Sequence, residues 1–172
     1  MKIFINAGHG GSDSGAVSKH GFKESEINRT IAAYLVQMLI VAGYDVEFFQ
    51  QTTSVEQVIE AEKKSNSHLF ISIHCNSFAK ETANGVEVLY YPTSGTGKAL
   101  AEIISENLAQ YMTLKNRGAK ARKDLRVLSG TKAPAILIEL AFLSNLKEEE
   151  LLLKEPYSFA SGILKGLQEW DK

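Results

Sequence analysis

The run Leu69-Phe70-Ile71-Ser72-Ile73-His74 decides the fold of this chain, because it is apolar at nearly every position. A strand with one solvated face alternates apolar and polar side chains, whereas a strand covered on both faces is a dense apolar run. A second run of this kind, Ala135-Ile136-Leu137-Ile138-Glu139-Leu140, follows Pro134 and has the composition of a central strand. Both runs therefore predict strands that are buried between two layers of helices.

Around these two runs, strand-like segments alternate with segments of helical periodicity. Short β-branched or aromatic runs predict further strands over residues 2–6, 46–49 and 86–91, with a short one over 125–128. Apolar residues recur every three or four positions over residues 27–42, 55–62, 100–112 and 159–170. This alternation predicts an α/β fold with a mostly parallel sheet, in which the 86–91 strand is able to pair antiparallel. Without a repeat or linker, we expect one domain over residues 1–172.

Composition excludes several classes of protein. The chain has 172 residues, 19 Lys plus Arg against 20 Asp plus Glu, and 44% hydrophobic residues. This balance lacks the positive charge of a typical nucleic-acid-binding domain. One cysteine excludes an intrachain disulfide and a CxxC zinc motif. No apolar run approaches the roughly 18 residues of a transmembrane helix, and the first residues are too short an apolar stretch for a secretory signal.

Three residues are candidates for chemistry because they lie near the carboxyl ends of predicted strands, where open α/β sheets place their sites. They are His9, His74 and Glu139. Glu139 interrupts an apolar run, and burial of an unpaired carboxylate costs several kcal/mol, which points to a cation, a metal or a catalytic role. A structural salt bridge for Glu139 and a hydrogen-bonded core position for His74 are the plain alternatives. In a regular strand Cys75 points away from His74, which disfavours a cysteine hydrolase and favours a core thiol.

Two histidines and nearby carboxylates suggest an open zinc site with His, Glu and His ligands. Spacing alone does not select the carboxylate, for which Asp13, Glu24 and Glu26 are candidates. Glu24 and Glu26 also suit a plainer role near a helix start, where the helix dipole stabilises acids. The Gly-rich loop at 8–15 fails as a phosphate loop, because Asp13 stands where a third glycine is needed.

Five segments in order resemble the zinc-dependent N-acetylmuramoyl-L-alanine amidases of the amidase-3 type, which are bacterial and phage cell-wall hydrolases. The segments are Ala7-Gly8-His9-Gly10-Gly11, Gly21-Phe22-Lys23-Glu24-Ser25-Glu26-Ile27-Asn28, Phe70-Ile71-Ser72-Ile73-His74-Cys75-Asn76, Asn116-Arg117-Gly118, and residues 134–145. The resemblance implies a twisted six-stranded sheet with helices on both faces. It also implies one Zn²⁺ per chain held by His9, Glu24 and His74, and Glu139 as the catalytic glutamate. By the same resemblance, substrate contacts fall on Asn76, Arg117, Leu125 and Arg126.

The activity that the resemblance implies is hydrolysis of the amide between N-acetylmuramic acid and L-alanine of the peptidoglycan stem peptide. A zinc peptidase, a related zinc deacetylase and a non-catalytic wall-binding module of the same fold remain alternatives. We expect a monomer that acts on the cell wall. Because no signal peptide is recognised, we expect either a phage or prophage endolysin or a module excised from a secreted protein.

Some positions depart from the family pattern or have no assigned role. Asn6 stands where the family often has Asp, so a carboxylate that orients a zinc-bound histidine is expected to be missing. Gln57 and Ala141 replace a common Arg and Gly, and residues 129–131 form an altered loop. The basic stretch 115–126 is interpreted as a solvated loop, or else as a rim that attracts stem-peptide carboxylates. Residues 148–150 are interpreted only as a charged helix start, and His20 and His68 receive no role.

Overall fold

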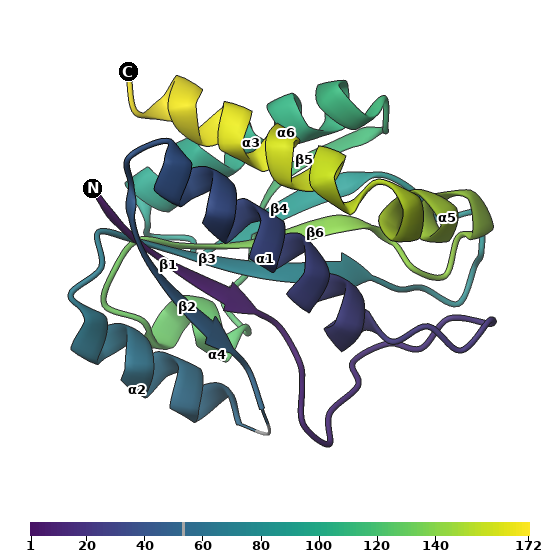
Figure 1. Cartoon of the computed structure of the whole chain (residues 1–172), viewed down its shortest axis with the longest axis horizontal. Helices are drawn as coiled ribbons and strands as arrows, with labels where there is room; N and C mark the ends of the chain where they lie inside the picture. Colours follow the sequence, from purple (N-terminus) through teal and green to yellow (C-terminus); the bar gives the residue numbers. More distant parts are fainter. Residues whose placement is uncertain (53) are drawn as a thin grey trace.

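A computed structural model describes residues 1–52 and 54–172 of the chain. Its strands are β1 (Lys2–Ala7), β2 (Asp45–Gln50), β3 (Leu69–Asn76), β4 (Val86–Tyr90), β5 (Asn116–Ala121) and β6 (Ala135–Phe142). Its helices are α1 (Glu24–Val41), α2 (Val55–Ser65), α3 (Gly95–Met112), α4 (Arg126–Gly130), α5 (Leu146–Lys154) and α6 (Pro156–Trp170). The expected α/β fold with a six-stranded sheet is confirmed (Figure 1).

The strands form one sheet in the order β2-β1-β3-β6-β4-β5. The pairs β1–β2, β1–β3, β3–β6 and β4–β5 are parallel, and β4–β6 is antiparallel. The two apolar runs of the sequence are the adjacent central strands β3 and β6. β2 lies on one side of β1 and β3 lies on the other side, so the order of the strands reverses between β1 and β3. Open α/β sheets commonly bind ligands at such a point.

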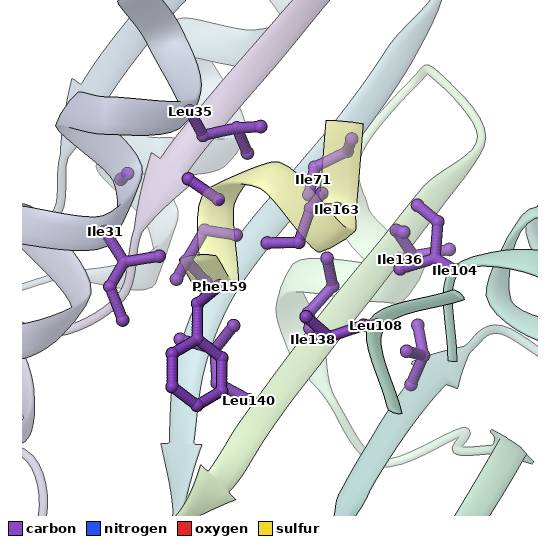
Figure 2. Packing of buried hydrophobic residues seen from close by; sticks show 14 of the residues in the cluster. Ile31, Leu35, Ile71, Ile104, Leu108, Ile136, Ile138, Leu140, Phe159 and Ile163 are labelled. Atoms are coloured by element: carbon purple, nitrogen blue, oxygen red, sulfur yellow. The ribbon is translucent and has the colours of Figure 1, made fainter. Parts of the chain in front are cut away.

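Helices cover both faces of the sheet, and the alternation of the strands decides which side chains meet which helices. Ile71, Ile73 and Cys75 of β3 face the larger core, which α1, α3 and α6 complete. Figure 2 shows Phe159 and Ile163 of α6 beside Ile71, Ile138 and Leu140 of the central strands. The opposite face buries a smaller cluster under α2 and α4, with Phe70 and Leu137 in its floor.

Helix boundaries follow local chemistry. Ser54 caps α2 by accepting a hydrogen bond from the backbone N–H of Glu56, as its position predicts. Pro156 begins α6, where its missing N–H leaves no hydrogen bond unmade. The first long helix begins three residues before Ile27, which places Glu24 in its first turn.

Two predictions of secondary structure are wrong. Residues 125–128 do not form a strand: Leu125 precedes the short helix α4, and its carbonyl accepts hydrogen bonds from the N–H groups of Leu128 and Ser129. The fifth strand is instead Asn116–Ala121, within the stretch interpreted as a loop. It is an edge strand with small and charged residues, so it lacks the apolar pattern of a buried strand.

Among the described residues, none of the helices combines the length and the apolar character that crossing a membrane requires.

Candidate metal site and its neighbourhood

Three predicted ligands, His9, Glu24 and His74, come together from three separate segments of the chain. His9 follows β1, Glu24 begins α1 and His74 lies near the end of β3. Nε2 of His9 lies 3.4 Å from Oε1 of Glu24, and Nδ1 of His74 lies 3.1 Å from the same oxygen. One ligand atom from each residue lies within 4.8 Å of the other two. The structure therefore selects Glu24 over the other carboxylates as the group between the histidines.

Glycines lie where the backbone comes close to the side chains of the predicted ligands. A Cβ on Gly8 would lie 2.2 Å from the ring of His74, and one on Gly15 would lie 2.6 Å from Oε2 of Glu24. Gly15 also has a φ of 63°. These glycines therefore let the loop between β1 and α1 pack directly against the side chains of His74 and Glu24.

Glu24 is held in place by groups other than the histidines. Its side chain is 5% exposed, and its two oxygens accept hydrogen bonds from the backbone N–H groups of Ala16 and Cys75. Burial alone would raise the pKa of Glu24, but the hydrogen bond and charge of His74, the charge of His9 and the N–H of Ala16 leave that pKa below its ordinary value. Glu24 is thus a carboxylate at neutral pH.

Asp13 orients His9, which spacing alone did not reveal. Nδ1 of His9 lies 2.8 Å from Oδ2 of Asp13, and the N–H of Gly15 donates to Oδ1 of the same carboxylate. The hydrogen bond to His9, followed by that from Gly15, lowers the pKa of Asp13. A carboxylate at Nδ1 keeps the proton on that nitrogen and leaves the lone pair of Nε2 free for a ligand.

Asn6 stands where the family often has Asp, but His9 still has a carboxylate at its Nδ1. Asn6 is fully buried, accepts a hydrogen bond from Ser72 and donates to the carbonyls of Ala7 and Phe49. It links β1 to its neighbours, and the carboxylate that orients His9 comes from Asp13 instead.

Glu139 lies beside the three predicted ligands. It is opposite His74 in the register of β3 and β6, and it shares the face of Leu137 by strand alternation. Its Oε2 is buried and has no hydrogen-bond partner among the described residues. Burial and the negative charges of Glu24 and Glu87 raise the pKa of Glu139 to about 8, with Arg122 opposing them. Glu139 therefore forms no structural salt bridge with any residue that the structure describes.

Cys75 points to the other side of β3, as strand alternation predicts. It is 3% exposed and belongs to the larger core, where its Sγ donates to Oδ1 of Asn28 at 3.4 Å. Burial and the negative charges of Glu24 and Glu139 raise the pKa of this thiol well above its ordinary value. Cys75 is thus a core thiol and has no thiolate to offer at neutral pH.

The residues expected to contact substrate fall into two groups. Asn76 and Arg117 meet at Glu87 of β4, a residue not expected to belong to the site. Nδ2 of Asn76 donates to Oε1 of Glu87 at 3.1 Å, and Nε of Arg117 donates to Oε2 at 2.6 Å. Leu125 packs against the smaller core, and Arg126 forms a solvent-exposed ion pair with Glu56. The sequence does carry a signal for Glu87, because this charged residue interrupts the apolar run of Val86 and Val88 just as Glu139 interrupts its own strand.

Other residues left without a role have structural ones. The interpretation of residues 148–150 as nothing more than a charged helix start is wrong, because Glu148 accepts backbone hydrogen bonds from Gly85 and Phe142. Oε1 of Glu149 lies 2.6 Å from Nδ1 of His20. His68 accepts a hydrogen bond from the N–H of Lys2.

Comparison with known proteins places the chain in a family. The sequence model of the N-acetylmuramoyl-L-alanine amidase family matches residues 3–169, and the chain belongs to this family. Among curated relatives, the probable cell wall amidase LytH of Staphylococcus saprophyticus is 31% identical over 98% of this chain and 57% of its own length. The endolysin of Bacillus phage SPP1 is 33% identical over 97% of this chain and 65% of its own length. The chain thus spans about three fifths of these two relatives.

Solved structures agree with the fold across nearly the whole chain. The CwlD amidase of Clostridioides difficile, solved with the GerS lipoprotein, superimposes with a TM-score of 0.93 at 29% identity, covering 98% of this chain and 97% of that one. The catalytic domain of the N-acetylmuramoyl-L-alanine amidase CwlV from Bacillus (Paenibacillus) polymyxa gives a TM-score of 0.90 at 30% identity, with coverage of 98% and 97%.

Proposed function

We propose that this chain is a zinc-dependent hydrolase that cleaves the amide bond between N-acetylmuramic acid and L-alanine in peptidoglycan. The observation that carries the proposal is the cluster of His9, Glu24 and His74 beside the buried Oε2 of Glu139, which has no hydrogen-bond partner within residues 1–52 and 54–172. Membership of the amidase family supports the choice of bond. The names of the relatives, a cell wall amidase and an endolysin, support the cell wall as the place of action.

The donor atoms suit a zinc ion. Ligands about 2.0–2.2 Å from a tetrahedral zinc lie about 3.3 Å from one another, and the two distances to Oε1 of Glu24 are 3.4 and 3.1 Å. Three protein ligands leave the fourth position open, as in catalytic zinc sites. Bound zinc supplies Lewis acidity, which polarises a carbonyl group and lowers the pKa of a coordinated water.

Glu139 would move the proton during the reaction. Its carboxylate would accept a proton at Oε2 from the attacking water and return it to the nitrogen of L-alanine as the amide breaks. A carboxyl whose pKa lies near the working pH is suited to both steps, and that of Glu139 is raised to about 8 by burial and by neighbouring carboxylates. A positive charge held by Glu24 would move this pKa downward and favour the basic form.

The test combines metal analysis with product analysis. We expect the purified protein to contain about one zinc per chain and to lose activity when a chelator removes it. Digestion of purified cell wall should release free N-terminal alanine without new reducing sugar ends. New amino groups on lysine or diaminopimelate would instead identify a peptidase, and wall binding without any product would identify a binding module. Glu139→Gln should retain zinc and lose turnover by about 10²-fold or more.

We also propose that residues 1–172 form one catalytic domain that acts as a monomer. One continuous sheet and the larger core, to which helices from both halves of the chain contribute, support a single domain. Light scattering during size-exclusion chromatography would measure the mass in solution, and a mass of twice 18.9 kDa would contradict the monomer.

A further inference from the structure

Beside Glu139, on the side away from His74, lies a second charged cluster. β4 pairs with β6 so that Glu87 is directly opposite Glu139. Oε2 of Glu87 accepts hydrogen bonds at 2.6 Å from both Nε of Arg117 and Nζ of Lys120, two residues of β5. His74, Glu139, Glu87 and the two cations therefore follow one another across four neighbouring strands.

Glu87 holds these cations from a buried position, since only 8% of the residue is exposed. Burial alone would raise its pKa, but the hydrogen bonds and charges of Arg117 and Lys120 keep that pKa below its ordinary value. Glu87 is thus ionised, and its other oxygen accepts the hydrogen bond from Asn76. Two cations and one carboxylate leave a surplus of one positive charge within this cluster, on β5 beyond Glu87.

The guanidinium of Arg117 is fixed on several sides. Besides the bond to Glu87, its Nη1 donates to the carbonyl of Asn84 at 3.4 Å, and its Cζ lies 5.0 Å from the ring centroid of Phe142. The side chain is still 29% exposed. Only two of its N–H groups are occupied by partners among the described residues, so the remaining donors are free to meet a carboxylate in their fork geometry.

We propose that Glu87 is a positioning residue that holds Arg117 and Lys120 as a subsite for a free stem-peptide carboxylate on the amine side of the scissile bond. The inference rests on the proposed amidase function. β5 is two strand spacings from Glu139, about 10 Å, and an extended peptide covers about 3.3–3.6 Å per residue. Two residues span about 7 Å, and the Arg117 side chain extends back to Glu87 on β4, one strand spacing nearer to Glu139. A carboxylate on the residue after L-alanine is therefore within its reach. The enzyme should therefore prefer stem peptides whose carboxyl group there is free over those in which it is amidated.

The test uses a pair of soluble muropeptides that differ only in a carboxylate or a carboxamide on the residue after L-alanine. We expect the zinc-loaded protein to cleave the carboxylate form with a kcat/KM about 10–100 times higher, mainly through a lower KM, because charge-assisted hydrogen bonds are worth this much. Equal rates for both would overturn the subsite and leave the amidase proposal intact. Cleavage of neither would count against the amidase proposal itself.

Glu87→Gln tests the positioning role. Without the carboxylate, the two cations repel each other and Arg117 loses its Nε acceptor, so the preference should fall below about 3-fold. If Glu87 only neutralised the cations, removing its charge would raise the preference instead, and that result would overturn the inference. Glu150→Gln is the matched control, since it removes an ion pair of the same 2.6 Å length on the exposed face of α5 and should leave both substrates unaffected.

Arg117→Gln and the double variant show whether Glu87 acts through Arg117. We expect Arg117→Gln to abolish the preference and Glu87→Gln to add nothing in that background. An equal further loss in the double variant would contradict the inference.

Zinc content and circular dichroism report folding. If Glu87→Gln does not fold, Lys120→Gln, which keeps the Glu87–Arg117 pair, should still lower the preference several-fold, and an unchanged preference would contradict the subsite.

Discussion

At the scale of single residues, the candidate site depends on a few side chains whose partners lie far away in the sequence. Glu24 meets His74 fifty positions later, and the N–H of Cys75 donates to the same carboxylate. Asp13 lies at Nδ1 of His9, and Glu139 stands next to His74 with a buried Oε2 that has no hydrogen-bond partner in the described part of the chain.

Asp13→Ala should weaken zinc binding. The substitution removes the acceptor that keeps the proton on Nδ1 of His9, so Nε2 no longer presents its lone pair reliably. Loss of such an orienting carboxylate typically costs 10–100-fold in metal affinity, and competition with a fluorescent chelator would measure it. Asp45→Ala, at the exposed start of β2, should leave the affinity unchanged. An unaltered zinc Kd for Asp13→Ala would exclude the orienting role.

Glu139→Gln should change the pH dependence of stability in the zinc-free protein. The folded-state pKa of Glu139 is about 8, above its ordinary value of 4.5. Between these values the folded state binds more protons than the unfolded state, so the free energy of unfolding falls as pH rises. Urea unfolding in chelator at pH 5 and pH 8 should therefore show a decline that is smaller in the variant by about 2–4 kcal/mol, at about 1.36 kcal/mol per pKa unit.

The comparison between the two proteins isolates Glu139. The lowered pKa values of Asp13, Glu24 and Glu87 affect stability only at more acidic pH. The raised pKa of Glu148, caused by burial, contributes equally to both proteins. Parallel pH profiles for wild type and variant would show that Glu139 ionises without cost in the folded protein.

At the scale of elements, one buried carboxylate in the first turn of α5 binds the helix to the backbone at one end of the sheet. The residue Glu148 is 4% exposed, and its two oxygens accept hydrogen bonds of 2.7 Å from the N–H groups of Gly85 and Phe142. These N–H groups belong to the loop before β4 and to the end of β6. The first turn of α5 therefore fixes the backbone next to Arg117 and Phe142.

Glu148→Ala should destabilise the protein by about 2–4 kcal/mol, because two buried backbone donors lose their acceptor. Urea unfolding would give the change in the free energy of unfolding. Glu150→Ala, two residues later on the same helix, removes only an exposed ion pair and should cost less than about 1 kcal/mol. Similar losses for both variants would mean that the backbone hydrogen bonds of Glu148 carry no special weight.

Elements were predictable from the sequence to the extent that they are buried. The apolar runs of β3 and β6 identified them, and the periodicity of α1 and α6 located those helices. β5 was missed, since Gly118, Ala119 and Lys120 suit an edge strand whose cations are paired with Glu87 on β4. α4 was mistaken for a strand because five residues are too few for helical periodicity to appear.

At the scale of the whole molecule, α6 near the end of the chain packs against α1 near its beginning and against α3. Phe159 is fully buried, and Figure 2 shows it beside Leu140 of β6. The glycines at 162 and 166 let α6 approach α3, where a Cβ would lie 2.8 Å from Leu108 and 3.0 Å from Ile104. This helix therefore covers the larger core on the face of the sheet opposite His74 and Glu139.

Phe159→Ala should lower the free energy of unfolding by about 3–5 kcal/mol through lost burial and the cavity that remains. Gln168→Ala, on the exposed side of the same helix, should change it by less than about 0.5 kcal/mol. Thermal unfolding with zinc present would measure both. If α6 were peripheral to the fold, the two variants would unfold at the same temperature.

The sequence by itself determined the α/β class and the two central strands, and it pointed to His9, His74 and Glu139 as candidates for chemistry. These are properties of hydrophobic periodicity and of charged or imidazole groups placed at strand ends, and both are local. Spacing along the chain left open which carboxylate lies between His9 and His74. Only the tertiary structure showed that Asp13 orients His9 and that Glu87 joins Asn76 to Arg117. Such pairings depend on strand order, register and the paths of loops, which bring together residues that no spacing along the chain relates.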